Sequence, residues 1–421
     1  MKYIKLFILI ITTLIIGACG KEKNNNTIKV WAWDPNFNIK AIKIAQEEYN
    51  NKNPDQKIDL EIIDMARLDL EQKLITVLST EDESTYPDIL LLGDRNAPMI
   101  LNTYSKAFVP LQDIINYKDF ASYKVKGMTV NNNIYGIPFD TGVTGLFYRK
   151  DILEKAGYNE SDMNNLTWKQ FITIGKNVKE KTGIDIISFI PTEMAMFETI
   201  LQSQNSNYFN NDGSLNLVNN TAAKRTLKII KEMLDSKIVK QAIDWTTFVG
   251  AINGGTAASS LSGAWFTATV MATPEQKGLW RIAPTPRVDN YGVNASNEGG
   301  SSWYVMNTKN KELAKQFLSK TLGSDVELYQ KLLVDIGLVG TYLPAGNGQA
   351  YEQSVEFFGN QKIYKDFIKW MEEVPNIEYG KYYGEVTSSF MELFPNYYEG
   401  NLTEDKFLLD VQNKTQYLIE K

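Results

Sequence analysis

The chain has 421 residues, with 50 acidic against 44 basic side chains, one cysteine and no histidine. Without histidine, neither a Ser-His-Asp or Cys-His nucleophilic site nor a histidine-ligated metal centre can be assembled, and a single cysteine excludes a disulfide framework. The formal net charge of −6 argues against a nucleic-acid partner. The composition therefore favours carboxylate or lysine chemistry, or binding without chemistry, and it indicates no metal or cofactor. The length is sufficient for two domains.

The first 26 residues have the pattern of an export signal followed by a tether. Two lysines precede an apolar run at 6–16, which is too short to cross a bilayer as a stable helix. The sequence Ile16-Gly17-Ala18-Cys19 then resembles a bacterial lipobox, which implies that Cys19 becomes a lipidated N-terminus. We therefore expect a signal peptide at 1–18, a polar tether at 19–26 and a lipid anchor in a membrane, outside the cytoplasm. An ordinary signal peptide with a chance cysteine is the alternative.

The chain after residue 26 alternates predicted strands and helices. Strands are predicted at 28–33, 58–62 and 89–92, with helices between them that begin near Ile39 and Leu70. The βαβαβ order favours a parallel sheet, and such sheets bind ligands at the carboxyl ends of their strands. Site candidates by this position are Asp34, Asp64, Met65, Gly93, Asp94 and Arg95.

A second unit begins after residue 138. A strand is predicted at 146–148, and Thr167 with Gln170 has the spacing of a capping box that opens a helix. Further helices are predicted at 227–234 and 310–322. The proline-bounded segment Trp280-Arg281-Ile282-Ala283-Pro284-Thr285-Pro286 indicates an extended connection between lobes.

Several short motifs occur in one order along the chain. They are Val30-Trp31-Ala32-Trp33-Asp34, Pro87-Asp88-Ile89, Tyr135-Gly136-Ile137-Pro138, Leu146-Phe147-Tyr148-Arg149-Lys150-Asp151, Thr167-Trp168 with Phe171, Gly255-Thr256-Ala257-Ala258, Gly263-Ala264-Trp265 and Gly299-Gly300. As an ordered set they resemble the family 1 extracellular solute-binding proteins, which include the sugar-binding proteins of ABC importers. Arg149 stands where that family usually has asparagine, and Lys169-Gln170 replace its usual acids.

The resemblance implies a two-lobed α/β fold, in which each lobe is a mostly parallel sheet flanked by helices and a hinged cleft lies between the lobes. The expected first lobe is 27–138 plus 287–340, and the expected second lobe is 139–286 plus 341–421. The crossings between them are expected near 138–141, 282–286 and 340–344. The implied partners are a carbohydrate and the permease subunits of an ABC transporter, and we expect a monomer.

A sugar site needs flat aromatic rings against the apolar faces of the sugar and polar groups around its edge. Trp33 and Trp265 lead the aromatic candidates, while Trp303 either meets the ligand or packs beneath the sheet. Asp140 is either a hinge-turn residue or an acceptor for hydroxyls, and one of Tyr382 and Tyr383 is expected to close the site. The expected ligand-binding residues are Trp33, Asp34, Asp94, Arg95, Asp140, Trp265, Gly300, Ser301, Trp303, Tyr382 and Tyr383.

Other aromatic and acidic residues are interpreted structurally. Trp31, Trp168 and Trp370 are expected in the core. Trp245 is expected to be structural, with the rim of the cleft as its other possible place. Glu193 and Glu198 are weaker site candidates, because acids on a solvated face are commoner.

The leading hypothesis is a lipid-anchored binding protein that captures a sugar, expected to be an oligosaccharide, and delivers it to a permease. A secreted glycosidase that uses two carboxylates is the alternative from another class, because that chemistry needs no histidine. A third hypothesis keeps the binding fold but exchanges the sugar for a polyamine or an anion. An anion would need an arginine such as Arg95 or a helix N-terminus.

Overall fold

The structure is a computed structural model that describes residues 26–421 except 211 and 377. The expected signal peptide and Cys19 lie outside the described residues. The larger sheet has the strand order β2-β1-β3-β12-β6. Its strands are β1 (Thr27–Ala32), β2 (Asp59–Asp64), β3 (Ile89–Gly93), β6 (Gly136–Pro138) and β12 (Ser301–Val305). β1 pairs in parallel with β2 and β3, which confirms the predicted βαβαβ unit, and β12 runs antiparallel to both β3 and β6.

Both faces of this sheet are covered, so its central strands are apolar throughout. In β3, Ile89 and Leu91 belong to one hydrophobic cluster, while Leu90 and Leu92 belong to another, and all four side chains are fully buried. Side chains alternate between the faces of a strand, so the two clusters occupy opposite faces. Trp31 joins the second cluster, as expected for a core residue.

Among the helices around this sheet are the three that the sequence predicts, near Ile39, near Leu70 and at 310–322. They are α1 (Asn38–Lys52), α2 (Arg67–Thr80), α3 (Ala97–Tyr104), α4 (Ser122–Gly127), α11 (Lys311–Lys320) and α12 (Val326–Ile336), together with a hairpin of β4 (Thr129–Val130) and β5 (Asn133–Ile134). The end of α1 comes just before Pro54, whose ring and missing N–H do not suit a continuing helix. α12 packs against α1 on the outside of the sheet.

The second sheet is built around β7 (Thr144–Arg149), which pairs antiparallel with β10 (Ser259–Gly263) and β11 (Trp280–Pro284). A parallel pair of β8 (Ile187–Phe189) and β9 (Val239–Gln241) continues this sheet through a parallel bridge between Asp185 and Ala257, beside β10. β7 therefore runs against its neighbours, as β12 does in the first sheet. The other strands of each sheet run in one direction, which fits the expected mostly parallel class.

The helices of the second lobe include the two that the sequence predicts there, one opened by Thr167 and one at 227–234. They are α5 (Lys150–Lys155), α6 (Trp168–Thr182), α7 (Ala195–Ser203), α8 (Thr221–Asp235), α9 (Trp245–Asn253), α10 (Thr267–Met271), α13 (Ile363–Glu373), α14 (Tyr383–Tyr398) and α15 (Glu404–Ile419). The predicted capping box of α6 is confirmed, because Thr167 Oγ1 accepts from the backbone N–H of Gln170 at 3.2 Å and Gln170 Oε1 accepts from that of Thr167 at 2.9 Å. Within the described part of the chain, none of the helices combines the length and apolar character that spanning a membrane requires.

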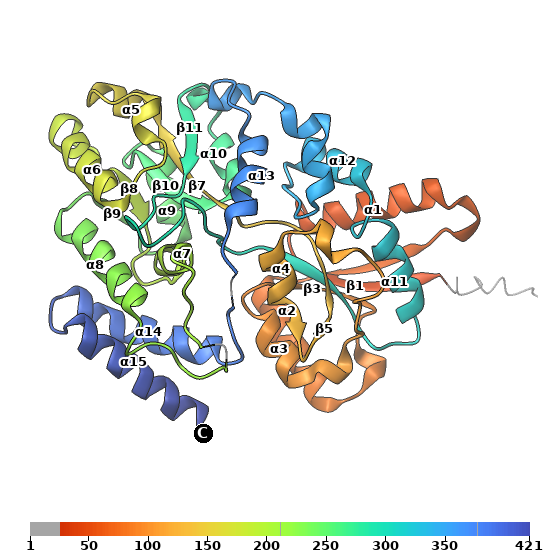
Figure 1. Cartoon of the computed structure of the whole chain (residues 1–421). Coiled ribbons are helices and arrows are strands. Elements are labelled where there is room, and N and C mark those ends of the chain that lie inside the picture. The colour runs from red at the N-terminus through yellow and green to blue at the C-terminus, as the bar shows by residue number, and fades with distance from the viewer. Residues whose placement is uncertain (1–25, 211, 377) are drawn as a thin grey trace, which may run out of the picture.

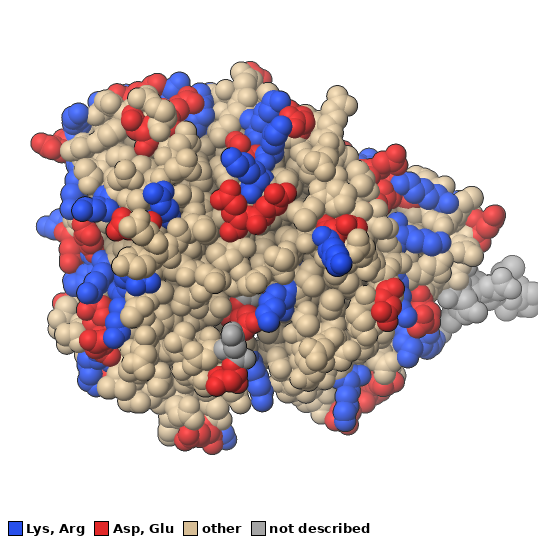
Figure 2. Space-filling view, viewed as in Figure 1, with Lys and Arg blue, Asp and Glu red and all other residues tan. Residues whose placement is uncertain are grey.

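Figure 1 shows the two sheets in two lobes side by side, with α1 and α11 on the right and α6 and α8 on the left. On the face drawn in Figure 2, basic and acidic residues are intermixed over both lobes. A nucleic-acid site would instead gather basic residues into a stripe or patch.

We propose that three segments run between the lobes, near 139–144, 296–300 and 339–344, and these segments bond to one another. The backbone N–H of Thr141 donates to Val339 O at 3.1 Å, and that of Thr144 donates to Ser296 O at 2.9 Å. The expected crossing at 282–286 is not among them, because residues 280–284 form β11. The prolines that suggested a linker are tolerated there, since β11 is an edge strand of the three-stranded sheet.

The segment after β11 still belongs to the second lobe. The backbone N–H of Arg287 donates to Leu166 O at 2.9 Å, and Asn294 Nδ2 donates to Thr285 O at 2.7 Å. We therefore propose that the second crossing lies at 296–300, so that 287–295 joins the second lobe and not the first.

Candidate functional site

A cleft of about 600 Å³ opens between the lobes. It is lined by the ends of strands from the first sheet, by a crossing segment, and by the start of α9 and the segment after β10 from the second lobe. The lining residues are Trp33, Asp34, Asn36, Phe37, Asn38, Arg67, Gly93, Asp94, Arg95, Asp140, Trp245, Trp265, Ala268, Thr269, Glu298, Gly299, Gly300, Ser301 and Ile336.

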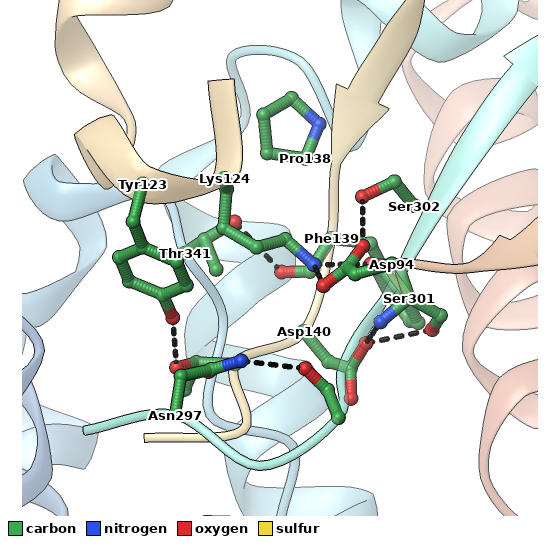
Figure 3. Close-up of polar contacts among 12 residues, drawn as sticks. Asp94, Tyr123, Lys124, Pro138, Phe139, Asp140, Asn297, Ser301, Ser302 and Thr341 are labelled. Carbon is green, nitrogen blue, oxygen red and sulfur yellow. Dashed lines mark hydrogen bonds and ion pairs between the residues drawn. The ribbon is translucent and has the colours of Figure 1, made fainter. Parts of the chain in front are cut away.

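The floor of the cleft is a buried ion pair between Lys124 of α4 and Asp94, which follows β3. Lys124 Nζ lies 2.5 Å from Asp94 Oδ2 and also donates to Ser301 O at 2.8 Å (Figure 3). Ser302 Oγ donates to Asp94 Oδ1 at 3.1 Å. Each carboxylate oxygen of Asp94 is thereby held by one donor, so the carboxylate has a fixed orientation beside the cleft.

Asp140 holds the start of β12 against the first crossing segment. Its Oδ1 accepts from both the backbone N–H and the hydroxyl of Ser301, at 2.7 Å each (Figure 3). The adjacent Gly300 has a φ of +98°, and a Cβ there would lie 2.6 Å from Asp94 Oδ2. Only glycine fits that backbone conformation and that close approach. Asp140 therefore bonds the segment after β6 to the start of β12 while also lining the cleft.

On the first-lobe wall, Trp33 and Asp34 follow β1. Asp34 adopts a φ of +62°, and its Oδ1 accepts from the backbone N–H groups of Asn36 and Phe37 at 3.1 Å each. A short side chain that bonds to the backbone two or three residues ahead sets the turn that leads into a helix. Asp34 thus positions the start of α1, and none of the residues that the structure describes donates a hydrogen bond to its Oδ2.

On the second-lobe wall, two indole rings lie side by side. The centroids of Trp245 and Trp265 are 5.9 Å apart at an interplanar angle of 41°, and Phe266 packs edge-on against both. Trp265 Nε1 donates to Glu298 O at 2.9 Å, which fixes the ring against the crossing segment. Trp245 is 48% exposed. The wall therefore offers an aromatic surface of the kind that packs against apolar ligand faces.

Arg95 extends from the first lobe toward the second. Its Nη2 atom lies 2.9 Å from Glu198 Oε2 on α7. Glu198 is 1% exposed and accepts from the hydroxyls of Tyr208 at 3.1 Å and Tyr383 at 2.7 Å.

A family model for bacterial extracellular solute-binding proteins matches residues 34–326. The chain is a bacterial extracellular solute-binding protein. It is 38% identical over 389 residues to the lactose-binding protein of Rhizobium radiobacter, with 92% of each chain covered. It is 28% identical over 340 residues to the arabinooligosaccharide-binding protein of Bacillus subtilis strain 168, with 76% of each covered.

Solved structures of other binding proteins share the fold of this solute-binding protein. The cyclic α-maltosyl-1,6-maltose-binding protein of Arthrobacter globiformis has a TM-score of 0.78 at 17% identity, with 94% of this chain and 99% of that chain covered. The galacto-N-biose/lacto-N-biose I-binding protein of Bifidobacterium longum has a TM-score of 0.72 at 22% identity, with 94% and 96% covered. The expected two-lobed α/β fold is confirmed.

The cleft of the solute-binding protein brings together most of the residues expected to bind ligand. Those that line it are Trp33, Asp34, Asp94, Arg95, Asp140, Trp265, Gly300 and Ser301. Trp303 lies elsewhere: it is fully buried in β12, with its ring centroid 5.7 Å from that of Phe139. Its place is therefore beneath the sheet, which was one of the two positions expected for it.

Tyr382 and Tyr383 are also not among the lining residues. Tyr383 is buried behind the cleft, where its hydroxyl binds Glu198, and Tyr382 is half-buried against the core with Lys381 Nζ 5.1 Å from its ring centroid. Tyr383 therefore supports a residue that contacts Arg95.

Three residues in or beside the cleft have a place that the sequence left open or did not indicate. Trp245 lines the rim, and Glu298 lines the crossing although no motif marked it. Glu198 is not on a solvated face, because burial in α7 and the approach of the other lobe enclose it. In the sequence, the apolar residues Phe197, Ile200 and Leu201 near Glu198 have the spacing of a buried helix face. This spacing indicates burial of the helix but not a partner for Glu198 on the other lobe.

The electrostatics of the cleft favour groups that donate hydrogen bonds. Burial raises the pKa of Asp94, and Lys124 opposes this rise. Burial likewise raises the pKa of Glu298, which Arg95, Ser262 and the backbone N–H of Gly263 oppose. Carboxylates that remain ionised in such a site accept strong hydrogen bonds from hydroxyls. Rings on the walls and carboxylates on the floor can therefore hold a ligand with apolar faces and a rim of hydroxyl groups.

Proposed function

We propose that this solute-binding protein captures a carbohydrate, a short oligosaccharide, in the cleft between its lobes. The observation that carries the proposal is that one cleft is lined by both the Trp245–Trp265 wall and the acidic residues Asp94 and Glu298. A pyranose presents apolar C–H faces to rings and hydroxyls to carboxylates. The volume of about 600 Å³ lies within the roughly 300–1,000 Å³ of small-molecule sites.

The relatives support the same class of ligand. The lactose-binding protein of Rhizobium radiobacter shares 38% of its residues with this chain, and the Bacillus subtilis relative binds arabino-oligosaccharides by its name. Lactose is therefore the first probe for this protein, with arabino-oligosaccharides and maltodextrins next to it in the panel.

We further propose that the protein delivers its sugar to the permease subunits of an ABC importer. Two lobes joined by three crossing segments can close around a ligand, and a ligand that contacts both walls shifts the equilibrium toward the closed form. A permease that recognises the closed form would then distinguish loaded from empty protein.

The proposal includes a lipid anchor at Cys19 and a monomeric state. Its support is the lipobox-like sequence Ile16-Gly17-Ala18-Cys19 behind a short apolar run. Expression in a bacterial host with a labelled fatty acid should transfer the label to the protein, and Cys19→Ser should abolish it. Unlabelled wild-type protein would contradict the anchor. Size-exclusion chromatography with light scattering tests the monomer.

Calorimetry with the sugar panel, joined to small-angle scattering, tests the central proposal. We expect saturable binding of at least one oligosaccharide and a smaller radius of gyration upon binding. No binding and no compaction with any glycan would overturn it. In the same samples, release of reducing sugar would instead identify a glycosidase, while binding of polyamines or anions alone would replace the ligand class.

A further inference from the structure

The ion pair between Arg95 and Glu198 joins the two lobes directly. Arg95 follows β3 of the first sheet, while Glu198 lies in α7 of the second lobe, and their Nη2 and Oε2 atoms are 2.9 Å apart. No hinge segment carries either residue. Any rotation that separates the lobes therefore separates this pair.

Glu198 is held in place by its own lobe. The hydroxyls of Tyr208 and Tyr383 both donate to its Oε1, and the two rings lie 6.2 Å apart. These three residues belong to the second lobe. Oε1 is therefore occupied within the lobe, and Oε2 is left to meet the guanidinium from the other side.

The loop that carries Arg95 is also held in place, by contacts within the first lobe. The neighbouring Asn96 donates from Nδ2 to Glu71 Oε2 at 2.9 Å, and the neighbouring Asp94 is bound by Lys124. The loop that carries Arg95 is thus anchored to α2 and α4. A side chain on such a base can bridge the cleft without moving its backbone.

The acids that face Arg95 come from the crossing segment and the second lobe. Besides Glu198, the carboxylates of Glu298 and Glu193 interact with the Arg95 charge. When the lobes separate, these acids lose their common cation, and Glu198 has only tyrosine donors. Truncating one partner of a buried ion pair is costly because the other charge stays buried and unpaired. Separating the lobes breaks the contact between Arg95 and Glu198, so the pair favours the arrangement of the lobes in which the two residues meet.

We propose that Glu198 is a positioning residue that holds Arg95 across the cleft, and that their ion pair is a latch which stabilises the closed form even without sugar. The latch rests on the proposed function, because it sets how much of the free energy of lobe closure the ligand must supply. It also fixes Arg95 as one end of the cleft, so the guanidinium stays oriented for the ligand as the lobes close.

A second interlobe pair provides a matched control. Lys126 of α4 and Glu378 lie 2.8 Å apart, but their side chains are 53% and 33% exposed. Exposed pairs contribute little because water screens them. Glu378→Gln removes an interlobe carboxylate as Glu198→Gln does, yet we expect it to leave the lobe equilibrium unchanged.

The experiment measures the distance between the lobes in the full chain without sugar. Lys43 of α1 and Lys228 of α8 are exposed residues on different lobes and are replaced by cysteine for spin labelling. Cys19→Ser in every variant leaves only the introduced thiols to react. Double electron–electron resonance then gives the closed and open populations for wild type, Glu198→Gln, Arg95→Gln and Glu378→Gln.

We expect Glu198→Gln and Arg95→Gln each to lower the ratio of closed to open protein by at least about tenfold, as for the loss of a close buried charge pair. Glu378→Gln should match wild type. The double variant should recover part of the closed population that either single variant loses, because removing both partners leaves no unpaired buried charge. Distance distributions that are the same in wild type and Glu198→Gln, whether both closed or both open, overturn the proposal.

Thermal unfolding separates this result from misfolding. If Glu198→Gln unfolds, Tyr383→Phe keeps the ion pair but removes one donor to Glu198, and a smaller opening is expected. An unchanged distribution in Tyr383→Phe together with an unchanged one in Arg95→Gln also overturns the latch. No sugar is added in the distance measurement, so a result that overturns the latch does not affect the proposal of sugar binding. Likewise, a calorimetric result that overturns sugar binding does not decide whether the latch exists.

Discussion

Lys124 places its Nζ 2.5 Å from Asp94 Oδ2 while its own side chain is 1% exposed. A cation this deeply buried is tolerated only when it is paired and its remaining protons are bonded, and Ser301 O accepts one of them. The pair connects α4, the end of β3 and the start of β12. The floor of the cleft is therefore defined by an electrostatic contact as well as by the sheet.

Breaking this pair from one side should destabilise the protein. Lys124→Met leaves Asp94 buried without its cation, for which we expect a loss of about 3–5 kcal/mol in the free energy of unfolding, measured with urea. Lys124→Met combined with Asp94→Asn should recover part of that loss, since no uncompensated charge remains. A double variant less stable than Lys124→Met alone would contradict this account.

On acidification, sugar affinity should begin to fall at a higher pH than it would if the carboxyl groups of the site had ordinary pKa values. Burial raises the pKa values of Asp94 and Glu298 above 3.8 and 4.5, so both lose the charge that accepts hydroxyl donors earlier during acidification. Calorimetry from pH 8 downward measures this, and Glu298→Gln should remove its share of the pH dependence. A flat affinity down to pH 3.8, which lies below the folded pKa of both groups, would exclude both residues from hydroxyl recognition.

The contribution of the same two groups to folding stability has the opposite sign. A carboxyl group with a raised pKa in the folded state holds its proton where the unfolded chain has lost it. Its contribution is fully present below the unfolded pKa and is lost as the pH rises through the folded pKa. Acidification through this window therefore stabilises the fold at Asp94 and Glu298 while it weakens binding. Measuring the sugar affinity and the free energy of unfolding of the same variants across this pH range separates the effect on binding from the effect on stability.

Trp265→Ala should weaken sugar binding at least tenfold, or about 1.4 kcal/mol, and leave the protein folded. The ring lines the cleft and its Nε1 bonds Glu298 O. Trp265→Phe keeps an aromatic face but loses that hydrogen bond, so an intermediate affinity is expected. Calorimetry and circular dichroism of the three proteins make the comparison. Equal affinity for wild type and Trp265→Ala would remove Trp265 from the site.

Gly142→Ala should destabilise the crossing between the lobes. A Cβ at Gly142 would lie 2.2 Å from Glu298 O, and the same two residues share a backbone hydrogen bond of 2.7 Å from Glu298 N to Gly142 O. Forcing an atom into a closely packed contact costs about 1–3 kcal/mol. Thermal unfolding measures this loss.

Gly250→Ala is the matched control for Gly142→Ala. It lies inside α9 with no atom within 4 Å of the added Cβ, so the helix propensity of alanine should stabilise the protein by about 0.5–1 kcal/mol. A loss of stability in Gly250→Ala as large as that in Gly142→Ala would show that the crossing is not the cause.

The sequence predicts those parts of the cleft that depend on local periodicity. Asp34 and Asp94 follow strands of a βαβαβ unit, and parallel strands bring their carboxyl ends to one edge of the sheet. Both residues therefore lie at the cleft as expected. The position of Trp265 follows similarly from the glycine before it at the end of β10.

Features that depend on packing between distant segments could not be predicted in this way. Both faces of β12 are covered and all five of its residues are buried. An alternation of apolar and polar side chains therefore does not reveal which face Trp303 occupies. Glu198 is an acid on a helix, and the cation that pairs with it, Arg95, comes from the other lobe. The indole of Trp245 is exposed at the start of α9, where no spacing rule distinguishes a cleft rim from an open surface.

The place of β12 also governs the order in which the protein can be built. The strand pairs with β3 on one side and β6 on the other, so it fills the interior of the first sheet although it is formed by residues 301–305. Until that part of the chain has been synthesised, β6 has no sheet neighbour and β3 presents an open edge. The first lobe is therefore completed only after all the described strands of the second-lobe sheet have been synthesised, and a nascent chain that stops earlier exposes the edge of β3.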